Sequence, residues 1–220
     1  MSNSTPSLLI PYIPELDSQS SDEIIRTLDE HGTRQTIECL NWKEQYPYRP
    51  LTSINIAHSG SYIYIDYLVR CNYLRAVNYE NNSNVHQDSC VEFFVAPEGR
   101  APYYNFEFNC IGTIKASHRE SRNTAVTPLS DSDIASIAVL PSCGRRPFRE
   151  VEGLFTWDIL AAIPLSLLGL KYEGKPLELR GNFYKCASGT SQPHFLSWSP
   201  ISTPAPDFHR PEYFGKIILD

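Results

Sequence analysis

The chain has 220 residues, of which 41% are hydrophobic, and its 25 acidic and 19 basic side chains give a formal net charge of -6. This composition is ordinary for a globular protein and argues against a disordered or fibrous chain. No Lys/Arg-rich stripe is present, so nucleic acid is not an expected partner. No segment approaches the length of a membrane span, and none is expected to bind a membrane.

The aromatic and cysteine contents narrow the class of protein and the kinds of site to be expected. Thirteen tyrosines and three tryptophans accompany a single methionine, and flat amphipathic rings suit a β-protein that binds sugars. The six cysteines are dispersed without C-x-x-C spacing, so a thiolate metal site is not expected. Disulfides are possible in a secreted protein, but free thiols packed as small hydrophobes are the favoured interpretation. The cysteines are Cys39, Cys71, Cys90, Cys110, Cys143 and Cys186.

The beginning of the chain offers no signal peptide, because it lacks a basic stretch and a sufficiently long apolar run. The protein is therefore expected in the cytoplasm as given, or in a secreted or periplasmic location if a leader was removed. Residues 1–33 predict an N-terminal edge strand, interrupted by Pro11 and Pro14, and then a helix over residues 20–30 that Gly32 ends. We expect both to pack onto a sheet as a brace.

Strand patterns occupy most of the remaining chain. Residues 154–164 alternate poorly, which indicates a strand buried on both faces, and Pro164 suits the start of a short helix. The count is about nine to eleven strands with one or two short helices, and no linker divides them, so we predict an all-β fold: a single antiparallel, jelly-roll-like β-sandwich over residues 1–220. The expected strands are 34–42, 53–57, 61–71, 91–95, 104–110, 131–142, 154–164, 176–187, 194–200 and 215–219.

The stretch DSCVEFFVAPEGRAPYYNFEFNCIG, residues 88–112, carries the most interpretable chemistry. Its apolar residues alternate with polar ones in both halves, which predicts a hairpin with one face in the core. Matching the two core faces requires paired residue numbers that sum to about 199, which places Glu92 opposite Glu107. Opposed like charges are unfavourable, so a ligand surface is favoured over a merely solvated face. The polar face holds Cys90, Glu92, Phe94, Asn105, Glu107 and Asn109.

Two loops are candidates to border that face. The loop over residues 72–87 is polar and aromatic, and Tyr73, Tyr79 and His86 could line a binding surface. The C-terminal stretch DFHRPEYFG resembles a catalytic cluster when taken out of context, but an internal ion-pair lock at the pocket edge is the favoured interpretation. Its charged residues are Asp207, His209, Arg210 and Glu212, and Phe208 and Phe214 are expected to fix it to the core.

With these segments placed, the sequence resembles the family 9 carbohydrate-binding modules, especially their stand-alone members. The resemblance runs from about Thr36 onward and rests on DSCVEFFVAP, YYNFEFNCIG, FTWDILAAIPLSLLG, GNFYKCASG and HFLSWSPISTPAPDFHRPEYFGKI, in that order. It implies a β-sandwich that binds an oligo- or polysaccharide. The typical module holds a terminal sugar between two aromatic rings, with charged and amide side chains at its hydroxyls.

Carried over to this chain, the resemblance identifies a set of ligand-binding residues. Glu92 matches the family's acidic residue, whereas Glu107 stands where the family has an arginine. Trp198 matches one of the two rings, and Tyr79 or His86 is the candidate for the other. The predicted ligand-binding residues are Glu92, Asn105, Glu107, Asn109, Asn182, Trp198, Tyr79 and His86.

Non-catalytic carbohydrate binding is the favoured function, and two alternatives stay open. Glu92 and Glu107 could be the paired carboxylates of a glycoside hydrolase, which stand about 5–5.5 Å apart in retaining and about 6.5–9.5 Å apart in inverting enzymes. The chain lacks the E-x-D-x-x-E signature of sandwich glycosidases and any G-x-S-x-G motif.

The second alternative is a haem- or sugar-binding extracellular sandwich domain, to which the resembled family is structurally akin. Its axial haem ligands would come from Met1 or from His86, His194 and His209. No cofactor is expected. Asp131-Ser132-Asp133 could attract calcium, but two carboxylates without a fuller ligand pattern favour a solvated turn.

Overall fold

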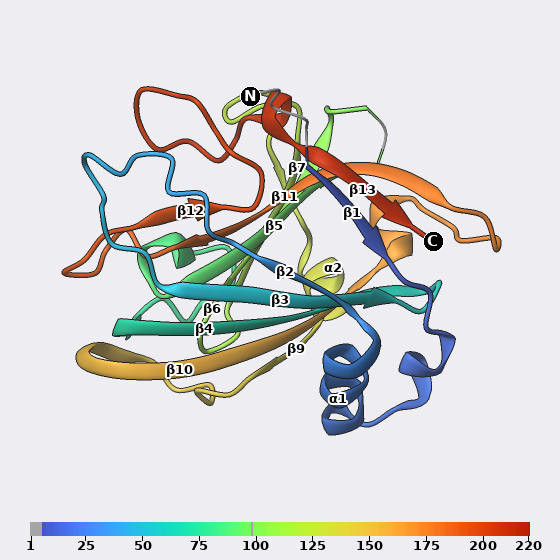
Figure 1. Ribbon diagram of the computed structural model, residues 1–220, viewed down its shortest axis with the longest axis horizontal. Helices are drawn as coiled ribbons and strands as arrows, with labels where there is room; N and C mark the ends of the chain where they lie inside the picture. The colour runs from blue at the N-terminus through green and yellow to red at the C-terminus, as the bar shows by residue number, and fades with distance from the viewer. Residues whose placement is uncertain (1–5, 98) are drawn as a thin grey trace.

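The computed structural model describes residues 6–97 and 99–220, which form two β-sheets (Figure 1). Met1, considered as a haem ligand, lies outside the described residues. In spatial order, sheet A contains β1 (Ser7–Ile10), β13 (Gly215–Leu219), β11 (Leu177–Cys186), β5 (Cys90–Ala96), β6 (Tyr103–Asn109), β7 (Ile114–Arg119) and β8 (Thr127–Pro128), and β12 (Phe195–Ser197) also pairs with β11. Sheet B contains β2 (Thr33–Thr36), β3 (Leu51–His58), β4 (Tyr62–Ala76), β10 (Phe148–Pro164) and β9 (Ala138–Pro141).

The predicted β-sandwich is confirmed at this level, with one correction. All described strand pairs are antiparallel except β1 with β13, where Ser7 pairs with Lys216 and Ile10 with Leu219 in parallel. The first strand joins the last one at the sheet edge and not a sequence neighbour, so no hairpin imposes the antiparallel direction. Sheet A is therefore mixed.

Helical segments are few and short. They are α1 (Ser21–His31), α2 (Asp131–Ala135) and the 3-10 turns η1 (Pro14–Ser18), η2 (Val85–Gln87), η3 (Leu165–Leu168) and η4 (Pro211–Tyr213). The predicted first helix is confirmed: Ser20 and Glu23 form a capping box at its start. Ile24 and Leu28 of α1 pack in one cluster with Tyr64 and Leu160 on the outer face of sheet B, so the helix braces that sheet.

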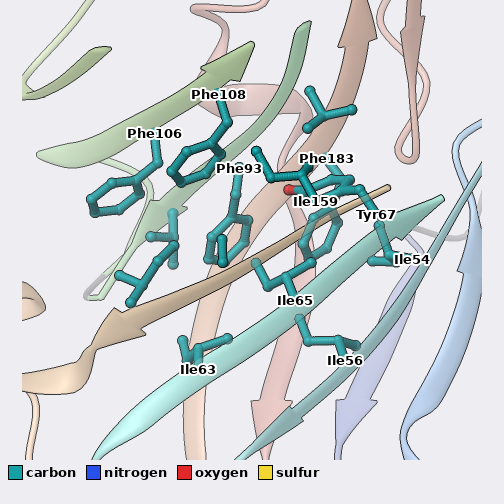
Figure 2. Packing of buried hydrophobic residues seen from close by; sticks show 14 of the residues in the cluster. Ile54, Ile56, Ile63, Ile65, Tyr67, Phe93, Phe106, Phe108, Ile159 and Phe183 are labelled. Atoms are coloured by element: carbon teal, nitrogen blue, oxygen red, sulfur yellow. The ribbon is translucent and has the colours of Figure 1, made fainter. Parts of the chain in front are cut away.

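The core lies between the two sheets and is largely aromatic on one side and aliphatic on the other. Figure 2 shows Phe93, Phe106, Phe108 and Phe183 of sheet A facing isoleucines of β3, β4 and β10. Phe93 and Phe183 stack with ring centroids 4.7 Å apart. Each fully buried ring contributes roughly 1.5–3 kcal/mol through the hydrophobic effect, so this layer holds the sheets together.

Two sequence predictions need correction. The predicted strand over residues 131–142 is half helical: Ser130 and Asp133 form a capping box for α2, and β9 begins only at Ala138. The carboxylate of Asp133 accepts hydrogen bonds from the backbone and hydroxyl of Ser130. In the structure this carboxylate therefore caps the helix α2. The predicted strand over residues 34–42 ends at Thr36, and Trp42 lies in a turn where its indole donates to the Thr203 carbonyl.

Lys185 is an exception within the apolar core. It pairs with Val91 in the β11–β5 ladder, which directs its side chain between the sheets, and it is fully buried. Its ammonium donates to the Cys186 carbonyl at 2.7 Å and lies 5.8 Å from the Trp157 ring centroid. No acidic side chain forms an ion pair with it in the described part of the chain. Burial lowers the pKa of Lys185, because the charged form loses hydration.

We expect Lys185→Met to stabilise the protein at neutral pH, by about 1–4 kcal/mol as for other buried charges replaced by apolar side chains of similar volume. Because the pKa of Lys185 is lower in the folded state, the unfolded state binds more protons below pH 10.5. The stability of the wild type therefore rises as the pH increases from the lowered value towards 10.5, and the variant lacks this rise. Thermal unfolding at pH 7 and pH 9 in metal-free buffer measures both effects.

The matched control is Lys175→Met, which changes an exposed lysine. Its unfolding temperature should stay close to that of the wild type at both pH values. If Lys185→Met lowers stability at pH 7, the core depends on the ammonium group and the expectation is wrong.

Candidate functional site

A pocket of ≈ 260 Å³ lies on the outer face of sheet A, on the side of these strands opposite to the core. Side chains of four adjacent strands, β11, β5, β6 and β7, form its floor. The turn η2, strand β12 and the loops after β7 and β12 form its wall. The floor residues are Cys186, Glu92, Glu107, Lys115 and Arg119, and the wall residues are His86, Arg122, Asn123, Phe195, Pro206, Asp207, Phe208 and His209.

The predicted register between the two hairpin strands is confirmed. Glu92 pairs with Glu107, and each side chain is only 3% exposed. The same face of the neighbouring strand carries Lys115, which pairs with Glu107. Two carboxylates and a lysine thus share the floor, next to the guanidinium of Arg119.

The two carboxylate oxygens of Glu107 differ in their hydrogen bonding within the described part of the chain. Asn105 donates to Oε1 of Glu107 at 3.0 Å, and the Asn105 oxygen accepts a hydrogen bond from Ser117 at 2.6 Å. Oε2 of Glu107 is buried and has no hydrogen-bond partner among the residues that the structure describes. Burial raises the pKa of Glu107, while Lys115 and Arg119 act in the opposite direction. A buried acceptor without a partner costs about 1–3 kcal/mol, so Oε2 is suited to a ligand.

Glu92 is surrounded by thiols. The Cys186 thiol donates to Oε1 of Glu92 at 3.1 Å, and the Cys90 sulfur lies 3.9 Å from the same oxygen. Burial raises the pKa of Glu92 well above its ordinary range, and the neighbouring Cys186 and Glu107 raise it further. Glu92 is therefore protonated over a wider pH range than an ordinary glutamate.

The C-terminal loop closes the pocket, and its predicted ion pairs are present. Asp207 binds Arg122 at 2.8 Å, and Arg210 pairs with Glu212. Phe208 stacks on Tyr184 with ring centroids 4.2 Å apart, in a second hydrophobic cluster that also contains Phe214. These rings fix the loop to sheet A, so that Asp207, Phe208 and His209 border the pocket.

Two predicted amide ligands are instead saturated by the protein. Asn109 donates to Asp88 and to the Asn78 carbonyl, and its oxygen accepts from the backbone of Thr113. Asn182 both donates to and accepts from the backbone of Ser199. Both side chains are fully buried and outside the pocket lining. Their hydrogen bonds position loops.

Trp198, the predicted aromatic plate, lies in the core. Its ring packs edge-on against Phe183 at 5.8 Å, it is 8% exposed, and its indole donates to Gln35. Strand β12 ends at Ser197, and the next residue enters the space between the sheets. Tyr79 is 64% exposed and lines a different hollow, with Ile111 and Ile114. Neither ring lines the pocket that Glu92 and Glu107 share.

Of the eight predicted residues, Glu92, Glu107 and His86 line the pocket, and Asn105 holds Glu107 in place. Sequence reasoning missed the basic side chains and the rings Phe195 and Phe208. A signal existed for the former, because alternation in IKASHR puts Lys115, Ser117 and Arg119 on one face. The resemblance implies a positive charge at position 107. This chain has Glu107 there, and the positive charge lies on the neighbouring strand at Lys115, the pairing partner of Glu107.

The six cysteines are free thiols, as the favoured interpretation predicted. Among the described residues, no helix is long and apolar enough to cross a membrane. A second hollow of ≈ 370 Å³ lies over β2, β3 and β4, but it contains none of the eight predicted residues.

Two mostly antiparallel sheets with a polar pocket on one outer face place the chain in the class of β-sandwich proteins. The sequence model of carbohydrate-binding family 9 matches residues 22–219. The chain therefore belongs to carbohydrate-binding family 9, and the resemblance noted in the sequence is confirmed.

Solved structures agree with this assignment. A candidate carbohydrate-binding protein from Bacteroides uniformis is 35% identical, with a TM-score of 0.91, and the match covers 99% of this chain and 100% of the other. A family 9 module from Caldicellulosiruptor kristjanssonii in complex with glucose is 14% identical, with a TM-score of 0.54, and covers 98% of this chain and 96% of its own. The cellotriose complex of such a module gives 14% identity, a TM-score of 0.53 and coverage of 96% and 92%. None of the curated proteins searched matches the chain.

A pH-dependent contribution to stability comes from His209 in the pocket wall. Burial lowers the pKa of His209 from 6.5 to about 3, and Arg119, Arg122 and Lys115 add to the shift. Its Nδ1 lies 3.0 Å from the Tyr103 hydroxyl. Between pH 6.5 and about 3 the unfolded state binds more protons at this residue, so stability falls as the pH decreases through that window.

We expect His209→Gln to lose less stability than the wild type between pH 6.5 and pH 4, measured by urea unfolding at each pH. The control is His31→Gln, because His31 lies exposed at the end of α1. This variant should lose as much stability as the wild type between pH 6.5 and pH 4. Equal slopes for wild type and His209→Gln would contradict the assigned shift.

Proposed function

We propose that the chain binds a carbohydrate in the pocket on sheet A and does not cleave it, with Glu92, Glu107, Lys115 and Arg119 contacting the hydroxyl groups. Membership of family 9 supports the class of ligand. Oε2 of Glu107 carries the choice of site, because it is a buried acceptor without a partner among the described residues and belongs to a residue that lines the pocket. A sugar hydroxyl is a donor of the right kind for it.

The mixture of groups on the floor suits a polyhydroxylated ligand. Carboxylates accept hydrogen bonds from hydroxyls, while the ammonium of Lys115 and the guanidinium of Arg119 donate to them. Lys115 and Glu107 are cross-strand partners, so a donor and an acceptor stand side by side. Neighbouring hydroxyls on one sugar ring present the same alternation of donor and acceptor.

Rings in the wall supply the apolar surface that the C–H face of a sugar needs. Phe195 and Phe208 both line the pocket, with centroids 6.1 Å apart and planes at 70°. In this proposal they take the sugar-stacking role that was predicted for Trp198. Phe195 is the more exposed of the two, since Phe208 is covered by its stacking on Tyr184. His86 and His209 extend this wall.

Hydrolysis is the second candidate because two carboxylates face each other. Directly paired antiparallel residues have Cβ atoms about 4.5–5.5 Å apart, which is compatible with the separation in retaining glycosidases. Against this, Glu92 is engaged by the Cys186 thiol and Glu107 by Asn105, and each is 3% exposed. The arrangement favours holding a ligand over protonating and attacking it.

The first test replaces one carboxylate. A glycan array selects the best ligand from a panel that includes glucose and cellotriose, the ligands of the Caldicellulosiruptor structures, and calorimetry gives its Kd. Glu107→Gln should weaken binding about 10- to 100-fold, because a hydrogen bond to a charged group contributes about 1.5–3 kcal/mol. The matched control is Glu178→Gln on β11, whose exposed carboxylate pairs with Lys216 outside the pocket.

Absence of sugar binding by the wild type would overturn the proposed function, and equal Kd values for wild type and Glu107→Gln would overturn the site. Incubation of the wild type with its best oligosaccharide should release no reducing ends. Release that is abolished by Glu107→Gln would replace the binding proposal with hydrolysis.

The second test separates the two aromatic assignments. Phe195→Leu keeps an apolar side chain but removes the flat ring, and should weaken sugar binding about 5- to 10-fold, in line with a ring contact of about 1 kcal/mol. Trp198→Phe should lower the free energy of unfolding by about 1–2 kcal/mol and leave Kd unchanged, because the ring is in the core. A loss of affinity in Trp198→Phe with no change for Phe195→Leu would identify Trp198, and not Phe195, as the ring that contacts the sugar.

A further inference from the structure

The floor of the pocket contains a pair of thiols that sequence spacing did not reveal. Cys90 on β5 and Cys186 on β11 are direct partners in the antiparallel ladder, and both are buried. Glu92 lies two residues after Cys90 and therefore on the same face. One ligand atom from each of these residues lies within 4.8 Å of the other two.

These separations match the needs of a tetrahedral metal ion. With Zn–S of about 2.3 Å and Zn–O of about 2.0–2.2 Å, two ligands of a tetrahedral zinc stand about 3.5 Å apart for S and O and about 3.8 Å for two sulfurs. In this protein Oε1 of Glu92 is 3.1 Å from the Cys186 sulfur and 3.9 Å from the Cys90 sulfur. Small side-chain movements would bring all three to the required distances.

A second observation points to a ligand in the same pocket. Oε2 of Glu107 has no hydrogen-bond partner among the described residues, is buried, and belongs to the direct ladder partner of Glu92. Glu92, Glu107 and Cys186 all line the pocket, so the thiol cluster is reached from it. Two thiols and the Glu92 carboxylate form a donor set that a divalent cation would satisfy.

We propose that Cys90, Glu92 and Cys186 bind a divalent metal ion of the zinc type at the floor of the pocket, with the fourth position left for a ligand that enters from the pocket. Thiolates select zinc over calcium or magnesium, which bind through oxygen. The metal site can be tested in the absence of sugar, because its three protein ligands come from this chain, although Glu92 belongs to both proposals. It departs from the sequence expectation, which did not include a thiolate metal site.

Cobalt is the probe that reports directly on the thiolates. The reduced, chelator-stripped protein is titrated with Co²⁺ in the absence of sugar. We expect one equivalent to bind, with visible bands of tetrahedral cobalt and a near-ultraviolet thiolate-to-cobalt charge-transfer band, and Zn²⁺ should displace it. Cys90→Ser and Cys186→Ser should each lose most of the charge-transfer band and bind at least 100-fold more weakly, and Glu92→Gln should bind about 10-fold more weakly with the band retained.

Cys143→Ser is the matched control, because Cys143 lies beside Cys110 away from the pocket and its removal should leave the titration unchanged. Thermal unfolding with and without Zn²⁺ provides a second measurement: Zn²⁺ should raise the melting temperature of the wild type and of Cys143→Ser, but not of the Cys90 and Cys186 variants. A variant that fails to fold is replaced by the corresponding alanine.

Several results would overturn the metal site. They are the absence of stoichiometric Co²⁺ or Zn²⁺ binding, a cobalt spectrum without a thiolate band, and a Cys90–Cys186 disulfide that remains after treatment with a reductant. Sugar binding by the metal-free protein distinguishes the two proposals. A protein that binds sugar but no metal retains the proposed function and loses only the metal site.

Discussion

The pairing of β5 with β6 on one side and with β11 on the other is the constraint on which the rest of the structure depends. It places Phe93 between Phe106 and Phe183 in the core, and it places Glu92 between Glu107 and Tyr184 on the outer face. Side chains alternate along a strand, so a shift by one residue would exchange the two faces. The aromatic layer that stabilises the sandwich therefore also fixes the register of the pocket.

This coupling explains why part of the site could be predicted from the sequence. The alternation in the hairpin identifies its core face, and the core face then determines which polar side chains oppose each other. The pairing of Glu92 with Glu107 follows without any knowledge of the other strands. The same logic holds for the hairpin of β3 and β4, where Ile63, Ile65 and Tyr67 face the core as expected.

The rest could not be predicted, because it depends on contacts between distant segments. An asparagine on a strand has the same pattern whether a ligand or a loop satisfies it, and only the fold shows Asp88 beside Asn109 and Ser199 beside Asn182. Trp198 follows a strand of three residues, too short for alternation to indicate its direction. The thiols of Cys90 and Cys186 are adjacent only across a ladder, so a rule based on local spacing misses them.

The polar groups of the outer face differ in how completely the protein satisfies their hydrogen bonds, and this difference is the basis on which the site is proposed. Buried polar networks stabilise a fold when every member has a partner, and they destabilise it when one member has none. Asn109 and Asn182 have their hydrogen-bonding groups engaged, whereas Oε2 of Glu107 has no hydrogen-bond partner among the residues that the structure describes, although Lys115 and Arg119 line the same pocket. A buried acceptor without a partner destabilises a fold by about 1–3 kcal/mol. The proposed ligand would supply the missing partner and so offset the cost of a glutamate on an interior strand of sheet A.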